Sequence, residues 1–194
     1  MRLFVAVEID SAVAQRIADF SAELRRKAML LAPGARMTWV HPEQIHVTVR
    51  FIGEADPAQA AAIAAVLQPE LTVRTFDMIL EGAGAFPPMG APRVLWAGIG
   101  RADELSALEQ EVSERLGECG VKREDRPYRP HLTLARVRDA SGLRSKPLFE
   151  ELAERRFGAT PVKAITLFQS RTSPKGATYV ALQQTSLRRG LGRT

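Results

Sequence analysis

A chain of 194 residues, 45% hydrophobic and 25% charged, has the length and composition of one soluble globular domain or of two small lobes that share a core. The single cysteine, Cys119, excludes an internal disulfide and a cluster of thiolate metal ligands. No apolar run approaches the roughly 20 residues that span a bilayer, and the first residues lack the features of a signal peptide, so we expect a cytoplasmic protein with no membrane segment. The formal charge of +5 is uneven, −1 over residues 1–97 and +6 over 98–194, which indicates an anionic partner for the second half or a basic surface that is simply solvated.

The first half of the chain alternates extended and helical patterns. In chain order we expect a strand over 3–9, a helix from Asp10 or Ser11 to about Leu31, a strand over 45–52, a helix from Pro57 that stops before Pro69, a strand over 71–80, a loop rich in Gly and Pro over 82–92, and a strand over 93–99.

The second half repeats this alternation. We expect a helix capped by Asp103 and ending near Gly117 and Gly120, a strand over 131–137, a short helix over 147–156, a strand pair over 162–170 and 177–185, and a frayed basic end over 186–194. Because strands and helices interleave in both halves, the predicted fold class is α+β, with residues 1–194 forming one domain of two similar lobes.

Two of the three histidines begin the same four-residue pattern. His46-Val47-Thr48-Val49 and His131-Leu132-Thr133-Leu134 both read histidine, apolar, threonine, apolar, and each lies in an expected strand. Because side chains two apart on a strand share a face, the histidine and the threonine point one way and the apolar residues pack on the helices. One such pattern is most simply a packed or edge histidine. Its duplication predicts a cleft between facing lobes, lined by two imidazoles and two hydroxyls.

That set of groups suits phosphate chemistry. Imidazole titrates near neutral pH, so one histidine can act as a base while the other acts as an acid. Threonine hydroxyls can donate hydrogen bonds to nonbridging phosphate oxygens. His41 lacks the pattern, precedes Pro42 and is expected in a loop. Since no two histidines stand at metal-ligand spacing, the sequence predicts neither a metal nor another cofactor.

The residues around both histidines resemble a known family. The matching stretches are WVHPEQIHVTVRFIG (39–53) and RPYRPHLTLAR (126–136), with further similarity over 84–98 and 168–179. They are similar to two-histidine phosphoesterases, and most of all to the bacterial and archaeal RNA 2',3'-cyclic phosphodiesterases, also called 2'-5' RNA ligases. The departures are Gln44 where the family usually has Asn, Val49 where Leu is common, and Tyr128 where Phe is frequent.

The resemblance implies a fold and a reaction. The fold has two pseudo-symmetric lobes, each an antiparallel sheet with helices outside, around a central cleft. The reaction opens a 2',3'-cyclic phosphate at an RNA end to a 2'-phosphate without a metal. In this scheme His46 protonates the departing 3' oxygen and His131 activates the attacking water. Thr48 and Thr133 hold the phosphate, and Arg136 assists them.

Strand alternation leaves the flanking residues harder to place. Arg136 is five residues after His131 and points away from the histidine face, unless the strand ends or bulges near Ala135 or the side chain curls over the edge. Phe51 falls on the core side by the same rule. Phe86 and Tyr128 could each stack on an RNA base or simply pack. Trp39 and Trp96 are expected in the lobe cores.

The resemblance also implies the partner, an RNA end with a 2',3'-cyclic phosphate, such as a tRNA fragment, bound by a monomer. A 5'-hydroxyl in place of water would give weak 2'-5' ligation that needs no ATP. Two alternatives stay open. One is a two-histidine enzyme for small cyclic nucleotides or oligoadenylates, and the other is a module that binds RNA ends without turnover.

Overall fold

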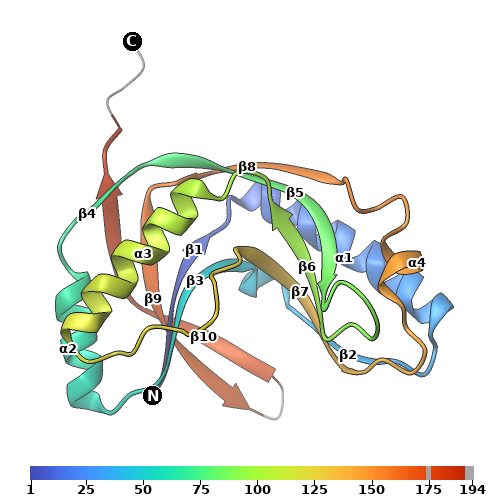
Figure 1. Ribbon diagram of the computed structural model, residues 1–194, viewed down its shortest axis with the longest axis horizontal. Helices are drawn as coiled ribbons and strands as arrows, with labels where there is room; N and C mark the ends of the chain where they lie inside the picture. Colours follow the sequence, from blue (N-terminus) through green and yellow to red (C-terminus); the bar gives the residue numbers. More distant parts are fainter. Residues whose placement is uncertain (174–175, 191–194) are drawn as a thin grey trace.

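Two five-stranded sheets form the frame of the molecule, of which the computed structural model describes residues 1–173 and 176–190 (Figure 1). The first sheet contains, in spatial order, β3 (His46–Glu54), β1 (Arg2–Glu8), β9 (Ala164–Ser173), β10 (Gly176–Arg188) and β4 (Leu71–Arg74). The second contains β2 (Arg36–Trp39), β7 (His131–Asp139), β6 (Val94–Ile99), β5 (Phe76–Phe86) and β8 (Arg156–Val162). The predicted α+β class and the two-lobed plan are confirmed.

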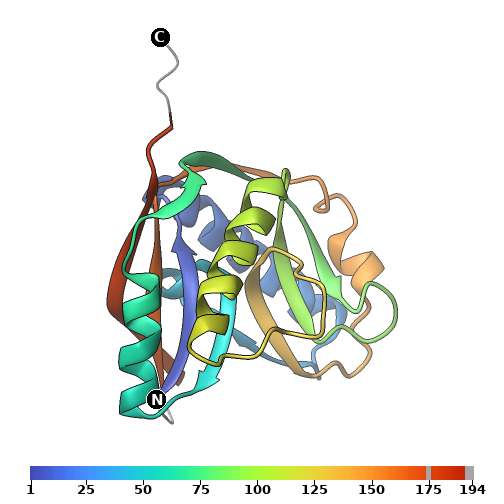
Figure 2. The same cartoon turned by 60° about the vertical axis from the view of Figure 1, so that its left-hand side comes forward.

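Each sheet carries two helices. The helices α2 (Pro57–Leu67) and α3 (Asp103–Glu118) lie side by side on the first sheet, as Figure 2 shows. The helices α1 (Ser11–Leu31) and α4 (Ser145–Phe149) pack with the second sheet, and a short 3-10 helix, η1 (Pro42–Gln44), precedes β3. The apolar stripe of α1, from Val13 to Ala28, is fully buried. This burial is what the helical periodicity predicts.

The two lobes do not coincide with the two halves of the sequence. The first sheet takes strands from both ends of the chain, and the second takes β2, β5 and most of β6 from the first half. α1 follows a strand of the first sheet but packs on the second, while α3 follows β6 and packs on the first. The lobes are therefore interwoven, and both ends of the chain contribute to the lobe that carries His46.

Helices α1 and α2 start where the sequence predicts, and an Asp side chain caps each of them. The Asp10 carboxylate accepts hydrogen bonds from the amides of Ala12 and Val13, and the Asp56 carboxylate accepts one from Gln59. The prediction for Asp103 is wrong because Ala102 is the cap and Asp103 is the first helical residue. In the first turn its charge still favours the positive end of the helix dipole.

Gly and Pro inside β5 and β8 caused errors in the predicted elements. The predicted loop over 82–92 is wrong for its first five residues, since β5 continues to Phe86. The predicted helix over 147–156 is displaced: α4 ends at Phe149, and β8 starts at Arg156. β8 tolerates Pro161 because it is an edge strand. The four-residue strand β2, also at an edge, was not predicted.

The basic end of the chain is part of the first sheet for longer than expected. β10 runs to Arg188, and Leu187 is buried opposite Leu71 of β4. The prediction of fraying is therefore wrong for residues 186–188, while residues 191–194 lie outside the described residues. The β4–β10 pair is parallel, so the first sheet is mixed rather than purely antiparallel. In the part of the chain that the structure describes, no helix is both long enough and apolar enough to cross a membrane.

Candidate functional site

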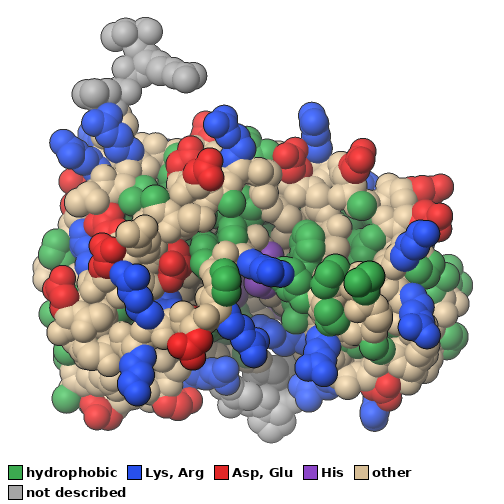
Figure 3. All heavy atoms as spheres, in the orientation of Figure 1, with side chains coloured by type: hydrophobic (Ala, Val, Ile, Leu, Met, Phe, Trp, Pro, Cys, Tyr) green, Lys and Arg blue, Asp and Glu red, His purple; other side chains and the backbone are tan. Residues whose placement is uncertain are grey.

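The two histidine motifs meet in one cleft. A cavity of about 580 Å³ is lined by His46 and Thr48 from β3 and by His131, Thr133 and Arg136 from β7. Figure 3 shows histidine side chains between the two halves of this face, with Lys and Arg side chains around them. The structure therefore brings together all five polar residues that the sequence singled out.

Both motif strands carry a bulge at the same position. Thr48 and Arg50 are opposite adjacent residues of β1, and Thr133 and Ala135 are opposite adjacent residues of β6. The fourth residue of each motif, Val49 or Leu134, is thus an extra residue in its strand. A bulge of this kind reverses the alternation beyond it. The two strands accordingly share one burial pattern over their first seven residues.

The bulges decide where the residues five positions after each histidine point. Arg136 faces the cleft. The cause is a bulge next to Ala135, which was one of the explanations that the sequence left open. The expectation that Phe51 packs in the core is wrong, because its ring is 49% exposed and lines the cleft. Beyond each bulge, Arg50 and Ala135 turn inward and are buried instead.

The two imidazoles are oriented by equivalent hydrogen bonds. Nδ1 of His46 lies 2.7 Å from the carbonyl oxygen of Gln44, and Nδ1 of His131 lies 2.7 Å from that of Arg129. A carbonyl only accepts, so each Nδ1 carries the hydrogen and donates it. Each Nε2 is left to exchange a proton with a bound molecule. Both imidazoles are thus held in the tautomer that acid–base catalysis at Nε2 requires.

Burial and a nearby cation tune both histidines. Burial lowers the pKa of His46 below its ordinary value of 6.5; the bond to the Gln44 carbonyl opposes this, and the positive charge of Arg136 lowers the pKa further. Burial likewise lowers the pKa of His131, against the bond to Arg129 and together with the charge of Arg136. Both effects disfavour the charged form of an imidazole. Arg136 therefore acts electrostatically on both histidines at once.

Each imidazole packs against the edge of an aromatic ring. The ring centroids of His46 and Tyr179 are 5.2 Å apart at 89°, and those of His131 and Phe86 are 5.1 Å apart at 86°. The ring of Phe4, which is buried, also contacts His46 at 5.1 Å. Phe86 thus contacts a candidate catalytic residue. It also lines a second cavity, of about 930 Å³, which lies beside the cleft.

Contacts within the protein hold Tyr128 and Trp96 in place, and Tyr128 also lines the larger cavity beside the cleft. The Tyr128 hydroxyl donates to the Thr48 carbonyl at 2.9 Å, which ties the loop before β7 to β3, and burial raises its pKa. Trp96 lies opposite Thr133 on the cleft side of β6, and not in the lobe core as predicted. Its indole covers Gly84, where a Cβ would lie 2.6 Å from the ring. Trp39 packs against the core, as expected.

Sequence reasoning missed several cleft residues. Arg2 and Tyr179 line the same cavity, and Gln44 links His46 to the β9–β10 pair by donating from its side chain to the Ala177 carbonyl. Phe4 and Arg2 share the cleft face of β1. Because every residue from Leu3 to Val7 is buried, no alternation of apolar and polar residues marks that face in the sequence. Of these residues, only Gln44 drew attention in the sequence, because the family usually has Asn at this position.

A bound metal ion would need several ligating side chains close together. Among residues 1–173 and 176–190, no group of three His, Cys, Asp or Glu side chains could hold a metal ion. His41 is exposed at the start of η1 and lines neither the 580 Å³ cavity nor the larger one beside it. The absence of a metal from the chemistry stays a prediction that chelation tests.

Comparison with known proteins agrees with this geometry. A family model of the 2'-5' RNA ligase superfamily matches residues 9–174. An RNA 2',3'-cyclic phosphodiesterase of Archaeoglobus fulgidus is 34% identical over 187 residues, 94% of this chain and 98% of the relative. One of Thermus thermophilus is 33% identical over 201 residues, 100% of this chain and 93% of the relative.

Solved structures share the fold. The Thermus thermophilus protein TT0787 superposes with a TM-score of 0.73 at 27% identity, over 97% of this chain and 99% of that one. Escherichia coli LigT complexed with 3'-AMP gives a TM-score of 0.71 at 24% identity, over 96% and 97%, a likeness of fold. With both histidine motifs inside the matched region, the chain belongs to the 2'-5' RNA ligase superfamily.

Proposed function

We propose that this chain is an RNA 2',3'-cyclic phosphodiesterase, which hydrolyses the cyclic phosphate at an RNA end to a 2'-phosphate. One observation carries the proposal: two imidazoles, each with Nδ1 donating to a main-chain carbonyl, share one cleft with two threonines and an arginine. That set supplies an acid, a base and donors for a phosphate group, which together suffice for phosphodiester hydrolysis. The curated relatives named above carry this activity in their names.

In the proposed mechanism, His131 is the base and His46 is the acid. Nε2 of neutral His131 takes a proton from a water molecule, whose oxygen attacks phosphorus. The bond from phosphorus to the 3' oxygen breaks, and Nε2 of protonated His46 supplies the proton to that oxygen. Thr48, Thr133 and Arg136 bind the nonbridging oxygens as negative charge builds on them.

The same groups support ligation when the attacking oxygen is the 5'-hydroxyl of another RNA. The product then has a 2'-5' linkage, and no ATP is consumed because the strained cyclic diester is exchanged for another diester. We propose that this reaction is weak, since water is abundant and the second RNA has to be held as well. The enzyme is proposed to act as a cytoplasmic monomer without metal, on substrates such as tRNA fragments.

The cleft is larger than the reacting cyclic phosphate requires. The 580 Å³ cavity around the histidines is continuous with a second one of about 930 Å³, since Thr48, Phe51 and His131 line both. This space could hold a second nucleoside beside the reacting one, and it does not by itself distinguish an RNA end from a free cyclic nucleotide. Small cyclic nucleotides and oligoadenylates remain the alternative substrates. A module that only binds RNA ends would not need a matched acid and base.

The test is incubation with an oligoribonucleotide that ends in a 2',3'-cyclic phosphate. We expect conversion to a phosphomonoester, and slower conversion of free cyclic nucleotides. The matched control is the double variant His46→Gln, His131→Gln, which keeps the size and polarity of the side chains but loses both acid–base groups. If the wild-type chain bound the oligoribonucleotide without any conversion, the enzyme proposal would be wrong, and the chain would be a module that binds RNA ends.

A further inference from the structure

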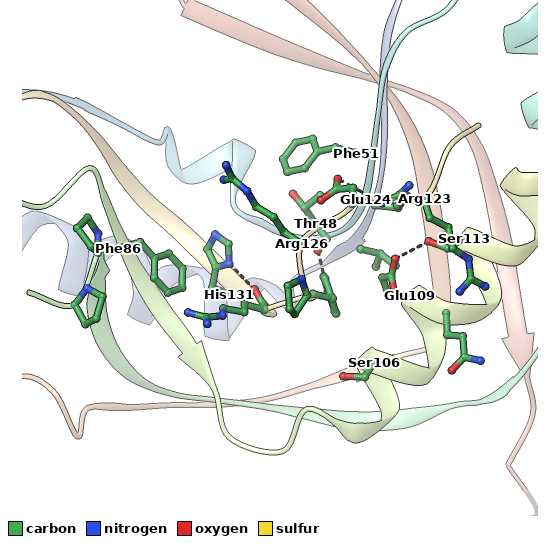
Figure 4. Close-up of a pocket in the computed structure, with 18 residues that line it drawn as sticks. Thr48, Phe51, Phe86, Ser106, Glu109, Ser113, Arg123, Glu124, Arg126 and His131 are labelled. Carbon is green, nitrogen blue, oxygen red and sulfur yellow. Dashed lines mark hydrogen bonds and ion pairs between the residues drawn. The ribbon is translucent and has the colours of Figure 1, made fainter. Parts of the chain in front are cut away.

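A second cavity, of about 930 Å³, opens from the cleft beside His131 (Figure 4). It shares Thr48, Phe51 and His131 with the cavity around the two histidines. His46, Thr133 and Arg136 do not line it. The larger cavity therefore extends the site away from His46 and past His131, and residues Thr48 to Phe51 of β3 form part of its wall.

The walls of this cavity differ in character. One wall is apolar and comes from Phe86, Pro87 and Pro88 at the end of β5. The opposite wall is α3, which contributes the hydrogen-bonding side chains of Ser106, Glu109 and Gln110, and Figure 4 shows Phe86 and Glu109 on opposite sides of the space. A flat apolar face combined with a few polar groups suits a nucleoside, whose base stacks and whose edges form hydrogen bonds.

The roof of the cavity is the segment between α3 and β7, and it is tied down from β3. Arg50, only 4% exposed, donates to the carbonyl of Lys122 and pairs with Glu124 at 3.5 Å. The Tyr128 hydroxyl holds the other end of the segment through the Thr48 carbonyl. A roof anchored at both ends forms the cavity before any ligand binds, which lowers the entropic cost of binding.

The position of this cavity identifies its occupant once the proposed function is accepted. In-line displacement puts the departing 3' oxygen next to His46 and the attacking oxygen next to His131, on opposite sides of phosphorus. A group that continues past His131 is therefore attached to the attacking oxygen. We propose that the 930 Å³ cavity binds the ribonucleoside that presents a 5'-hydroxyl, and so is the acceptor subsite for 2'-5' ligation.

The atoms of this reaction balance without a further reactant. The 5' oxygen forms a bond to phosphorus, and its proton passes to Nε2 of His131. The bond from phosphorus to the 3' oxygen breaks, and His46 gives that oxygen a proton. In the reverse direction the 3'-hydroxyl attacks a 2'-5' linkage, and the nucleoside in the cavity leaves as a free 5'-hydroxyl.

The test compares two substrates that differ only in the second nucleoside. They are 2'-5'-linked adenylyl-adenosine, which fills the cavity, and adenosine 2',3'-cyclic phosphate, which does not. Ser106→Trp and Gln110→Trp place a ring in the cavity from exposed positions on α3. Ala107→Trp is the matched control, because Ala107 is exposed on the same helix and does not line the cavity.

We expect both cavity variants to lower kcat/KM for cleavage of the dinucleotide by about tenfold or more, with hydrolysis of the cyclic phosphate kept within about twofold. Ala107→Trp should change neither. Ser106→Phe, a smaller filler, replaces any variant whose melting temperature falls. Unchanged cleavage of the dinucleotide, or an equal loss on both substrates, would overturn the acceptor subsite. A wild-type chain that hydrolyses the cyclic phosphate but never cleaves the dinucleotide would also overturn it, and the proposed function would stand. Failure to hydrolyse an oligoribonucleotide that ends in a 2',3'-cyclic phosphate would defeat the proposed function itself.

Discussion

Phe51 and Arg136 hold the same place in the two lobes, five residues after His46 and His131, and both face the cleft. They do so because each motif strand bulges at the residue after the threonine. The pseudo-symmetry of the backbone therefore ends in a chemical difference, an aromatic ring on one side and a guanidinium on the other. We expect the phosphate to contact the Arg136 side.

Replacing Arg136 by Gln should lower kcat/KM on a cyclic-phosphate oligoribonucleotide about 10- to 100-fold, because hydrogen bonds from charged donors are worth roughly 1.5–3 kcal/mol. Arg138→Gln is the control: this side chain is exposed on the same strand and binds the Thr38 hydroxyl instead of lining the cleft. Steady-state kinetics on both variants gives the comparison. Losses of equal size would reduce Arg136 to general surface charge.

Replacing either cleft histidine by Ala should lower kcat about 10²- to 10⁴-fold, the usual contribution of general acid or base catalysis. The melting temperature should change little, because both side chains are only half-buried and each bonds only to the carbonyl two residues before it. His41→Ala, at an exposed histidine outside both cavities, serves as the control. A cleft variant that keeps more than about half of the wild-type kcat would remove that histidine from the scheme.

The pH profile of kcat/KM should be a bell centred on the acid side of 6.5. Activity is lost as pH falls because His131 must be neutral, and it is lost as pH rises because His46 must be protonated. Burial, aided by Arg136, lowers both pKa values from 6.5, so both limbs move to lower pH. The limbs report the pair of histidines together.

Arg136→Gln gives this profile an internal check. Without the guanidinium, both histidine pKa values rise, and the bell should move to higher pH. Arg138→Gln should leave it in place. A profile that stays flat on one side of its maximum contradicts the acid–base pair.

Chelation should leave the rate unchanged. The proposed mechanism uses two imidazoles, two hydroxyls and a guanidinium, and no step needs a Lewis acid. The measurement is the rate after dialysis against EDTA, and again after zinc or magnesium is added back. Loss of activity in EDTA that a metal restores would change the proposal to metal-assisted hydrolysis.

The sequence predicted the cleft residues only as far as strand alternation holds. His46, Thr48, His131 and Thr133 obey it, and their repeated pattern was enough to place them together. At Val49 and Leu134 the alternation reverses, because each bulge is set by pairing with a neighbouring strand, which local sequence does not encode. Arg136 could therefore be assigned only by resemblance, and Phe51 was assigned to the wrong face.

Long-range arrangement limited the fold prediction in the same way. Gly84 is a residue type typical of loops, yet it lies in β5. A glycine is needed there because the Trp96 indole occupies the space that a side chain would fill. The exchange of α1 and α3 between the sheets also has no local signal. Where caps and apolar periodicity decide, as in α1 and α2, the predictions are confirmed within about three residues of the observed ends.

The position of the phosphate in the product tests the central claim most directly. A 2',3'-cyclic phosphate has two oxygens that can leave, and fixed roles for His46 and His131 permit in-line expulsion of only one. Phosphorus NMR of the product from a cyclic-phosphate oligoribonucleotide distinguishes the two outcomes. We predict a 2'-phosphate almost exclusively, with a free 3'-hydroxyl. A product that is mainly the 3'-phosphate would contradict the account, because the 2' oxygen would then be the one that leaves and takes the proton from the acid.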